Sequence, residues 1–265
     1  MKKSGQFDPG LPTPKPEVSE TWGVLLNNLG YGIRPTERAT RAASLARKLF
    51  EYPSFELPVV ARSYESTMTD FHNRFMVAGV LYLSNSDIYE SGGHSDHLTE
   101  LNTGKVSFQY LMREYCETFP LKSSRDTYDM LKAILSNART LVSGIPPNET
   151  PLQRAARGAS VSRILSGIVA EYIGCEGFKK IGFPLTTYSP SRHDIDFAED
   201  IMVRAQDGAT RSFQIKTSQT PLEIDRQKRP TILRIPLDID ARKPGFALHP
   251  HEAAAFRDEV LQQAA

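Results

Sequence analysis

The sequence has little cysteine, almost no net charge and no long apolar run, and each of these absences excludes a class of protein. Cys116 and Cys175 are its two cysteines, which is too few for a disulfide framework or a cysteine-rich metal site and fits a reducing compartment. No segment approaches the roughly 18 apolar residues of a membrane-spanning helix, and no apolar run follows the first residues. We therefore expect a soluble, cytoplasmic protein without a membrane partner.

The charge balance gives no general indication of a nucleic-acid partner. The formal net charge is +1 over 265 residues, so any attraction for DNA has to come from local basic patches. The chain also lacks the Gly-x-x-x-x-Gly-Lys-Ser/Thr motif of ATPases and helicases. A chain of this length forms either one large domain or two modest ones.

The chain divides into three regions. Prolines alternate with polar residues in region 1–18, which predicts a flexible arm. Region 19–145 reads as mainly helical, and region 150–265 as a separate domain that combines helices and strands. Helical periodicity and capping signals predict helices over residues 19–29, 36–50, 65–83, 106–119, 124–142, 151–174 and 250–262.

Two short runs with alternating apolar residues, 199–203 and 212–217, flank a Gln-Asp-Gly turn at residues 206–208. Alternation on both sides of a glycine-containing turn is typical of a β-hairpin. Residues 231–236 predict a further strand.

The register of this hairpin decides whether three polar side chains meet. If Gly208 takes the left-handed position of a three-residue loop, Asp200 faces Gln214, and Lys216 follows on the same face. A two-residue Asp-Gly turn would instead pair Asp200 with Ile215 and turn its side chain away. We favour the first register because it leaves the other face largely apolar. That face would carry Ile201, Val203, Ala205, Phe213, Ile215 and Thr217.

An amphipathic helix precedes the hairpin and is predicted over Pro151–Gly174, with Thr150 as its N-cap. Glu171 lies at the margin of its apolar stripe. Gly167 and Gly174 lie one turn before and after it, so this edge of the helix has little side-chain bulk and can approach a strand or a metal closely.

This part of the chain resembles the core of the PD-(D/E)xK nucleases. The resemblance is carried by a helical glutamate, a strand that opens with aspartate and a neighbouring strand that reads Gln-x-Lys. The resemblance covers about residues 155 to 265. It implies an α/β fold: a restriction-endonuclease-like core whose mixed sheet is flanked by helices, preceded by the helical region. It also implies that Glu171, Asp200 and Gln214 bind Mg²⁺, and that Lys216 positions or activates the attacking water.

The chain departs from the commoner family pattern at Gln214, which occupies a position usually held by glutamate. An amide oxygen can still coordinate a metal, but the site loses one negative charge, so we expect lower metal affinity. Asp194 and Asp196 compete with Asp200 as the strand aspartate, because they are an even number of positions before it and would lie on the same face of an extended strand. Asp200 is favoured because it is level with Gln214.

Two basic patches are candidates for contact with DNA phosphates. One follows the helix over residues 36–50, and the other is a loop beside the proposed site, in a stretch where nine basic residues outnumber five acidic ones between positions 204 and 243. The candidate DNA-binding residues are Arg34, Arg38, Arg41, Arg226, Lys228 and Arg229.

Together these patterns predict a magnesium-dependent endonuclease that acts on double-stranded DNA. A type II restriction endonuclease is favoured because a compact chain without an ATPase motif must select its own target, and such enzymes are often homodimers since both strands are cut. A repair or anti-phage nuclease is one alternative, and an inactive DNA-binding protein with a nuclease fold is another.

Overall fold

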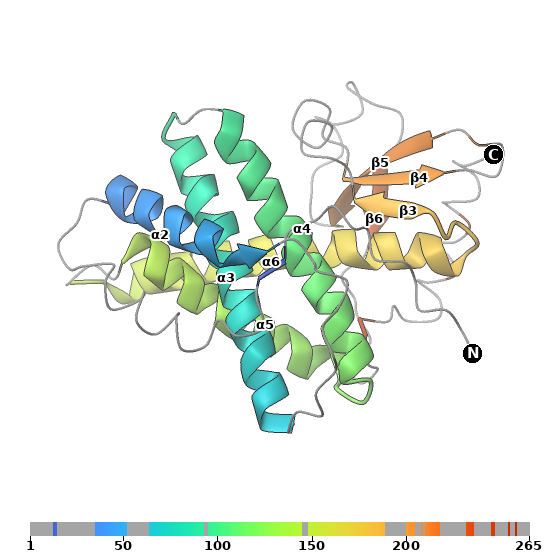
Figure 1. Ribbon diagram of the computed structural model, residues 1–265, viewed down its shortest axis with the longest axis horizontal. Coiled ribbons are helices and arrows are strands. Elements are labelled where there is room, and N and C mark those ends of the chain that lie inside the picture. The colour runs from blue at the N-terminus through green and yellow to red at the C-terminus, as the bar shows by residue number, and fades with distance from the viewer. Residues whose placement is uncertain are drawn as a thin grey trace. The chain divides into compact units, whose positions relative to one another are not determined.

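The computed structural model describes residues 13–14, 35–51, 64–92, 95–144, 148–188, 200–204, 208, 210–217, 232–235, 245–246, 254 and 258. The helices are α2 (Pro35–Leu49), α3 (Tyr64–Glu90), α4 (Ser95–Thr118), α5 (Ser124–Ser143) and α6 (Pro151–Lys180) (Figure 1). The strands are β1 (Thr13–Pro14), β2 (Phe50–Glu51), β3 (Thr186–Tyr188), β4 (Ile201–Arg204), β5 (Thr210–Thr217) and β6 (Ile232–Ile235). Among these helices, none is both long and apolar enough to cross a membrane.

The predicted α/β, restriction-endonuclease-like core is wrong, because the described part of the chain is mostly helical. Its main sheet has four short strands of 3, 4, 8 and 4 residues in the order β3-β4-β5-β6. The helices are longer than their local signals predicted: α4 begins at Ser95 and α6 continues to Lys180. Tertiary packing therefore extends the helices beyond the segments with clear periodicity, and the strands remain too short for a large central sheet.

Several individual elements agree with the sequence-based expectations. Helix α5 and strand β6 lie within one residue of their predicted bounds, and α2 ends one residue early because Phe50 begins a two-residue strand. That strand pairs with Thr13–Pro14, inside the predicted N-terminal arm. The helix predicted over residues 19–29 lies outside the described residues, as does nearly all of the one over 250–262.

The chain forms two compact units, and each of them consists of two separate stretches. The first unit comprises residues 1–111 and 134–148, and the second comprises residues 112–133 and 149–265. The predicted boundary near residue 145 thus lies close to one junction. The end of α4 and the start of α5 nevertheless belong with the C-terminal stretch.

The first unit is a helical bundle in which small residues allow close packing. Helix α2 turns a stripe of alanines inward, each at most 5% exposed: Ala39, Ala42, Ala43 and Ala46. Helices α3 and α4 approach closely at Gly104, where a Cβ atom would lie 2.6 Å from the backbone nitrogen of Tyr82. Phe75 and Phe108 fill the same interface, with ring centroids 4.9 Å apart. Glycine at position 104 is therefore a packing requirement.

The second unit is built from the small sheet and helix α6, which lies along it (Figure 1). The Phe178 ring of α6 lies 4.8 Å from the Phe213 ring of β5, centroid to centroid. The sheet positions that face this interior are buried: Ile201, Val203, Phe213 and Ile215. Strands β3, β4 and β5 are antiparallel, and β6 adds to β5 in parallel. The sheet therefore has one apolar face covered by α6 and one polar face.

Candidate functional site

Helix α6, which carries Glu171, starts at a well-defined N-terminus. The Thr150 side chain accepts a hydrogen bond from the backbone N–H of Gln153, and the Gln153 side chain accepts one from the backbone N–H of Thr150. This reciprocal capping, with Pro151 at the start of the helix, confirms the predicted beginning. Just before the cap, the nearly buried Glu149 carboxylate pairs with Arg157 at 3.0 Å.

Glu171 itself is half-buried, and its surroundings on α6 are those that the glycine spacing predicted. A Cβ atom on Gly167 would meet nothing within 4 Å, and Gly174 is buried. The helix edge is therefore open one turn before Glu171, at Gly167, and covered by other residues one turn after it, at Gly174.

The β4–β5 hairpin has the register that was favoured from the sequence. Its ladder pairs Ile201 with Phe213 and Arg204 with Thr210. The pairing stops at Ile201, so the predicted pairing of Asp200 with Gln214 is not part of the ladder. Gly208 has φ +83°, the left-handed conformation that the three-residue loop requires.

Asp200 adjoins this ladder and is tied to β5 through both its backbone and its side chain. Its N–H donates to the Phe213 carbonyl at 2.9 Å. Its carboxylate Oδ2 accepts a hydrogen bond from the backbone N–H of Ile215 at 2.6 Å. Ile215 is the middle residue of the Gln-x-Lys sequence, so the carboxylate lies directly beside the backbone that carries Gln214 and Lys216.

Gln214 and Lys216 alternate with buried residues along β5. Both are half-buried, whereas Phe213 and Ile215 point into the apolar interior, so the two polar residues belong to the other face of the sheet. Strand β6 flanks them on the far side, with Gln214 level with Ile232 and Lys216 level with Arg234. A carboxylate, an amide and an ammonium group thus occur within a short stretch of one sheet.

This set of donors fits a hard divalent cation. Mg²⁺ prefers carboxylate and amide oxygens, and Asp200 and Gln214 supply one of each from neighbouring strands. Within the described part of the chain, no three His, Cys, Asp or Glu residues gather as a metal-binding group. A magnesium site here therefore depends on the Gln214 amide.

The two described arginines of the first basic patch already have partners within the first unit. Arg38 donates from Nε to the carbonyl of Leu141 at 2.6 Å and so ties α2 to the end of α5. Arg41 is exposed and pairs with Glu37 at 2.8 Å, one turn earlier on α2. A phosphate would have to compete with these contacts. The other predicted DNA-binding residues lie outside the described residues, as do the alternative aspartates: Arg34, Arg226, Lys228, Arg229, Asp194 and Asp196.

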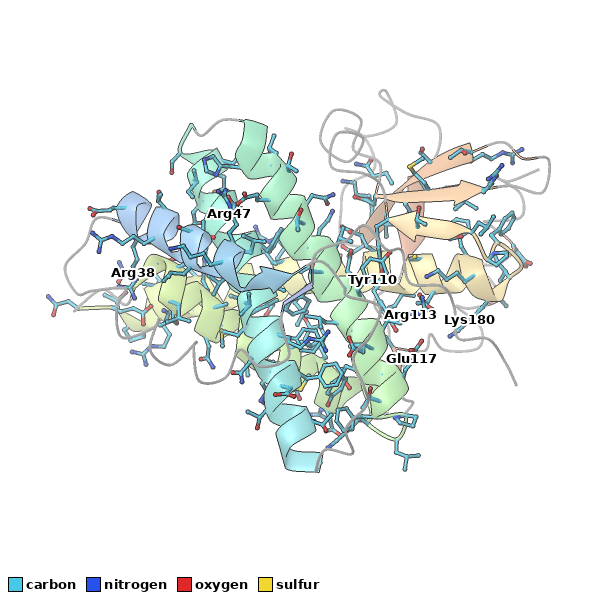
Figure 2. The ribbon with its side chains drawn as sticks, in the orientation of Figure 1. Arg38, Arg47, Tyr110, Arg113, Glu117 and Lys180 are labelled. Atoms are coloured by element: carbon cyan, nitrogen blue, oxygen red, sulfur yellow. The ribbon has the colours of Figure 1, made fainter. Side chains whose placement is uncertain are left out.

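A polar cluster between α4 and α6 was not predicted from the sequence. Burial raises the pKa of Cys116 to about 11, and burial also raises the pKa of Tyr172, which is hydrogen-bonded to it. Arg113 donates to Glu117 at 3.0 Å beside them, and Figure 2 shows both residues on α4 with Lys180 of α6 nearby. Because the thiol and the phenol stay protonated at neutral pH, we interpret this cluster as structural.

Sequence reasoning counted Arg204 in the basic stretch but did not choose it as a site residue, although it lies on the same sheet face as Gln214 and Lys216. The sequence could have indicated this, because every second residue of a strand lies on the same face and Arg204 is an even number of positions from Met202.

No protein-family model matches the chain, and neither a curated protein nor a solved structure matches it. The functional argument accordingly depends on the local geometry of these residues.

Proposed function

We propose that the protein is a magnesium-dependent endonuclease that hydrolyses phosphodiester bonds in double-stranded DNA. The observation that carries this proposal is the 2.6 Å hydrogen bond from the Ile215 N–H to the Asp200 carboxylate. It fixes an acidic oxygen beside a Gln-x-Lys strand, which is the local arrangement that the chemistry needs. The proposal relies on this arrangement alone, because the overall fold is mostly helical.

Each residue has a definite part in the proposed reaction. Asp200 and Gln214 would hold the magnesium ion. Glu171, the ligand predicted from the helix, belongs to α6, which covers the opposite, apolar face of the sheet. Bound magnesium supplies a Lewis acid that polarises the phosphate and favours hydroxide at neutral pH. Lys216 adds a positive charge that attracts the scissile phosphate and opposes the charge that builds up on it.

We further propose that the enzyme is a cytoplasmic, homodimeric type II restriction endonuclease. The sequence carries no ATPase motif, which favours an enzyme that selects its own target. Two copies related by two-fold symmetry would cut both antiparallel strands. A nuclease for damaged or foreign DNA remains the alternative, and the digestion pattern separates the two.

Digestion of supercoiled and linear plasmid DNA with and without magnesium tests the proposal. Discrete fragments support a restriction enzyme, whereas a smear supports a nuclease of low specificity. Asp200→Asn and Lys216→Ala should each abolish cutting. Arg125→Gln is the matched control, because Arg125 is an exposed residue of α5 that pairs with the exposed Asp129 at 3.9 Å. The absence of cutting on all DNA substrates, or unchanged cutting by Asp200→Asn, would refute the proposal.

A further inference from the structure

The polar face of the sheet continues beyond the candidate site to Arg204. Ile201 and Val203 are 0% and 2% exposed on the apolar face, so Met202 and Arg204 belong to the opposite face. The pairs Arg204–Thr210 and Met202–Ser212 extend this face across β4 and β5. Thr187 continues it into β3, level with Met202. One surface therefore joins Arg204 to Gln214 and Lys216.

The composition of this face suits an anionic partner. Beyond Asp200, its described positions carry two cations, hydroxyl groups, an amide and a thioether, and no acid: Thr187, Met202, Arg204, Thr210, Ser212, Gln214 and Lys216. Arg204 and Thr210 are exposed at the end of the sheet away from Lys216. The surface thus presents small hydroxyl-bearing side chains between two positive charges.

Several arginines of the helices are paired with an acidic side chain, among them Arg47, Arg139 and Arg154. No ion pair joins Arg204 to an acid among the residues that the structure describes. An exposed guanidinium group is able to bind a phosphate in bidentate fashion, because its N–H donors are planar and fixed in geometry.

The spacing along the strand sets how far Arg204 is from the proposed catalytic centre. Arg204 is four positions after Asp200, which corresponds to about 13 Å at about 3.3 Å per strand residue. Successive nucleotides of one DNA strand rise about 3.4 Å along the helix axis, so this distance covers about four nucleotides.

We propose that Arg204 is a positioning residue that binds a backbone phosphate of duplex DNA about four nucleotides from the bond that is cut. This inference rests on the proposed function. The contact would be independent of base sequence, because it involves the phosphate and not the base edges. Its role would be to hold the duplex along the polar face while Asp200, Gln214 and Lys216 engage the scissile phosphate.

Binding of a fluorescent DNA duplex by the full-length protein tests this proposal. Anisotropy is measured in EDTA over a series of salt concentrations, so that magnesium-dependent cutting cannot occur. Arg204→Gln should weaken binding about tenfold at low salt and lower the slope of log affinity against log salt by about 1. Arg204→Lys should restore the salt slope, and Arg125→Gln should match the parent protein.

Cleavage kinetics with magnesium give the second readout. Arg204→Gln should raise KM and leave kcat near the parent value, because the lost contact is remote from the reacting atoms. If the parent binds and cuts DNA but Arg204→Gln retains its affinity and salt slope, the role of Arg204 is refuted while the proposed function is retained. If the parent neither binds nor cuts duplex DNA, both proposals are refuted.

Discussion

The Asp200 carboxylate and the Ile215 backbone N–H are joined by a 2.6 Å hydrogen bond, so an acidic side chain takes the place of a strand carbonyl at the edge of the β4–β5 ladder. Asp200 is thereby both a sheet-forming residue and a neighbour of Gln214 and Lys216. Substitutions at this position should affect stability and proposed function separately, depending on whether an acceptor oxygen is retained.

Asp200→Ala should destabilise the second unit by about 1 to 3 kcal/mol, because the Ile215 N–H loses its acceptor in a half-buried position. Asp200→Asn keeps an oxygen that can accept this bond and should cost less than about 1 kcal/mol. Hydrogen exchange of the Ile215 amide measures the effect directly. Protection should fall in Asp200→Ala and persist in Asp200→Asn, and equal exchange in both variants would contradict this role for the carboxylate.

Gln214→Glu should lower the magnesium concentration for half-maximal cutting by about tenfold, because ligand charge is one of the features that set affinity for hard cations. The measurement is the rate of plasmid cutting across a magnesium titration. Gln153→Glu makes the same change of charge at the exposed start of α6 and suits the capping position. It should leave the magnesium dependence unchanged. A titration curve for Gln214→Glu identical to that of the parent would exclude Gln214 as a ligand.

Gly104→Ala should destabilise the first unit by about 1 to 3 kcal/mol, since the new methyl group meets the backbone of Tyr82 and neither helix can shift without disturbing the core. Gly79→Ala is the matched control. There the nearest atom is Cδ2 of Leu135 at 3.0 Å, the end of a flexible side chain, and the gain in helix propensity offsets the crowding. Thermal unfolding of the two variants should therefore separate them clearly. Equal melting temperatures would count against a tight approach of α3 and α4.

Cys116 and Cys175 should react slowly with an aromatic disulfide at pH 8 in the native protein. Burial raises the pKa of each thiol from 9.0 to about 11, so the reactive thiolate is scarce. Both should react rapidly in urea, which provides the control.

The raised pKa of the two thiols in the folded state also affects stability. The contribution of the protonated, buried thiols to the free energy of unfolding is complete below about pH 9 and is lost as the pH rises to about 11. The free energy of unfolding measured across this range should fall.

Local patterns predicted local structure well in this chain. The alternation of Ile201, Val203, Phe213 and Ile215 gave the correct strand faces, and the glycine at position 208 indicated the correct hairpin register. Both features are set by neighbours within a few residues, where side-chain periodicity and turn chemistry act directly.

The overall fold was not predictable in the same way. A resemblance carried by one helix and one hairpin implied a large α/β core, whereas the chain devotes most of its described length to packed helices. Nor could periodicity reveal that Arg38 bonds to Leu141, because a contact between residues 103 positions apart depends on how α2 and α5 pack. The metal and DNA roles of the candidate residues remain predictions.

Each compact unit is built from two separate stretches of the chain, and this has a practical consequence for expressing part of the protein. Expression of residues 1–148 alone would leave the tip formed by the end of α4 and the start of α5 without the C-terminal stretch that it belongs with. Tyr115 and Leu131, 2% and 0% exposed in the intact chain, would lose part of their cover. A fragment that ends at residue 148 would therefore aggregate. A soluble fragment would have to omit residues 112–133 or be expressed together with residues 149–265.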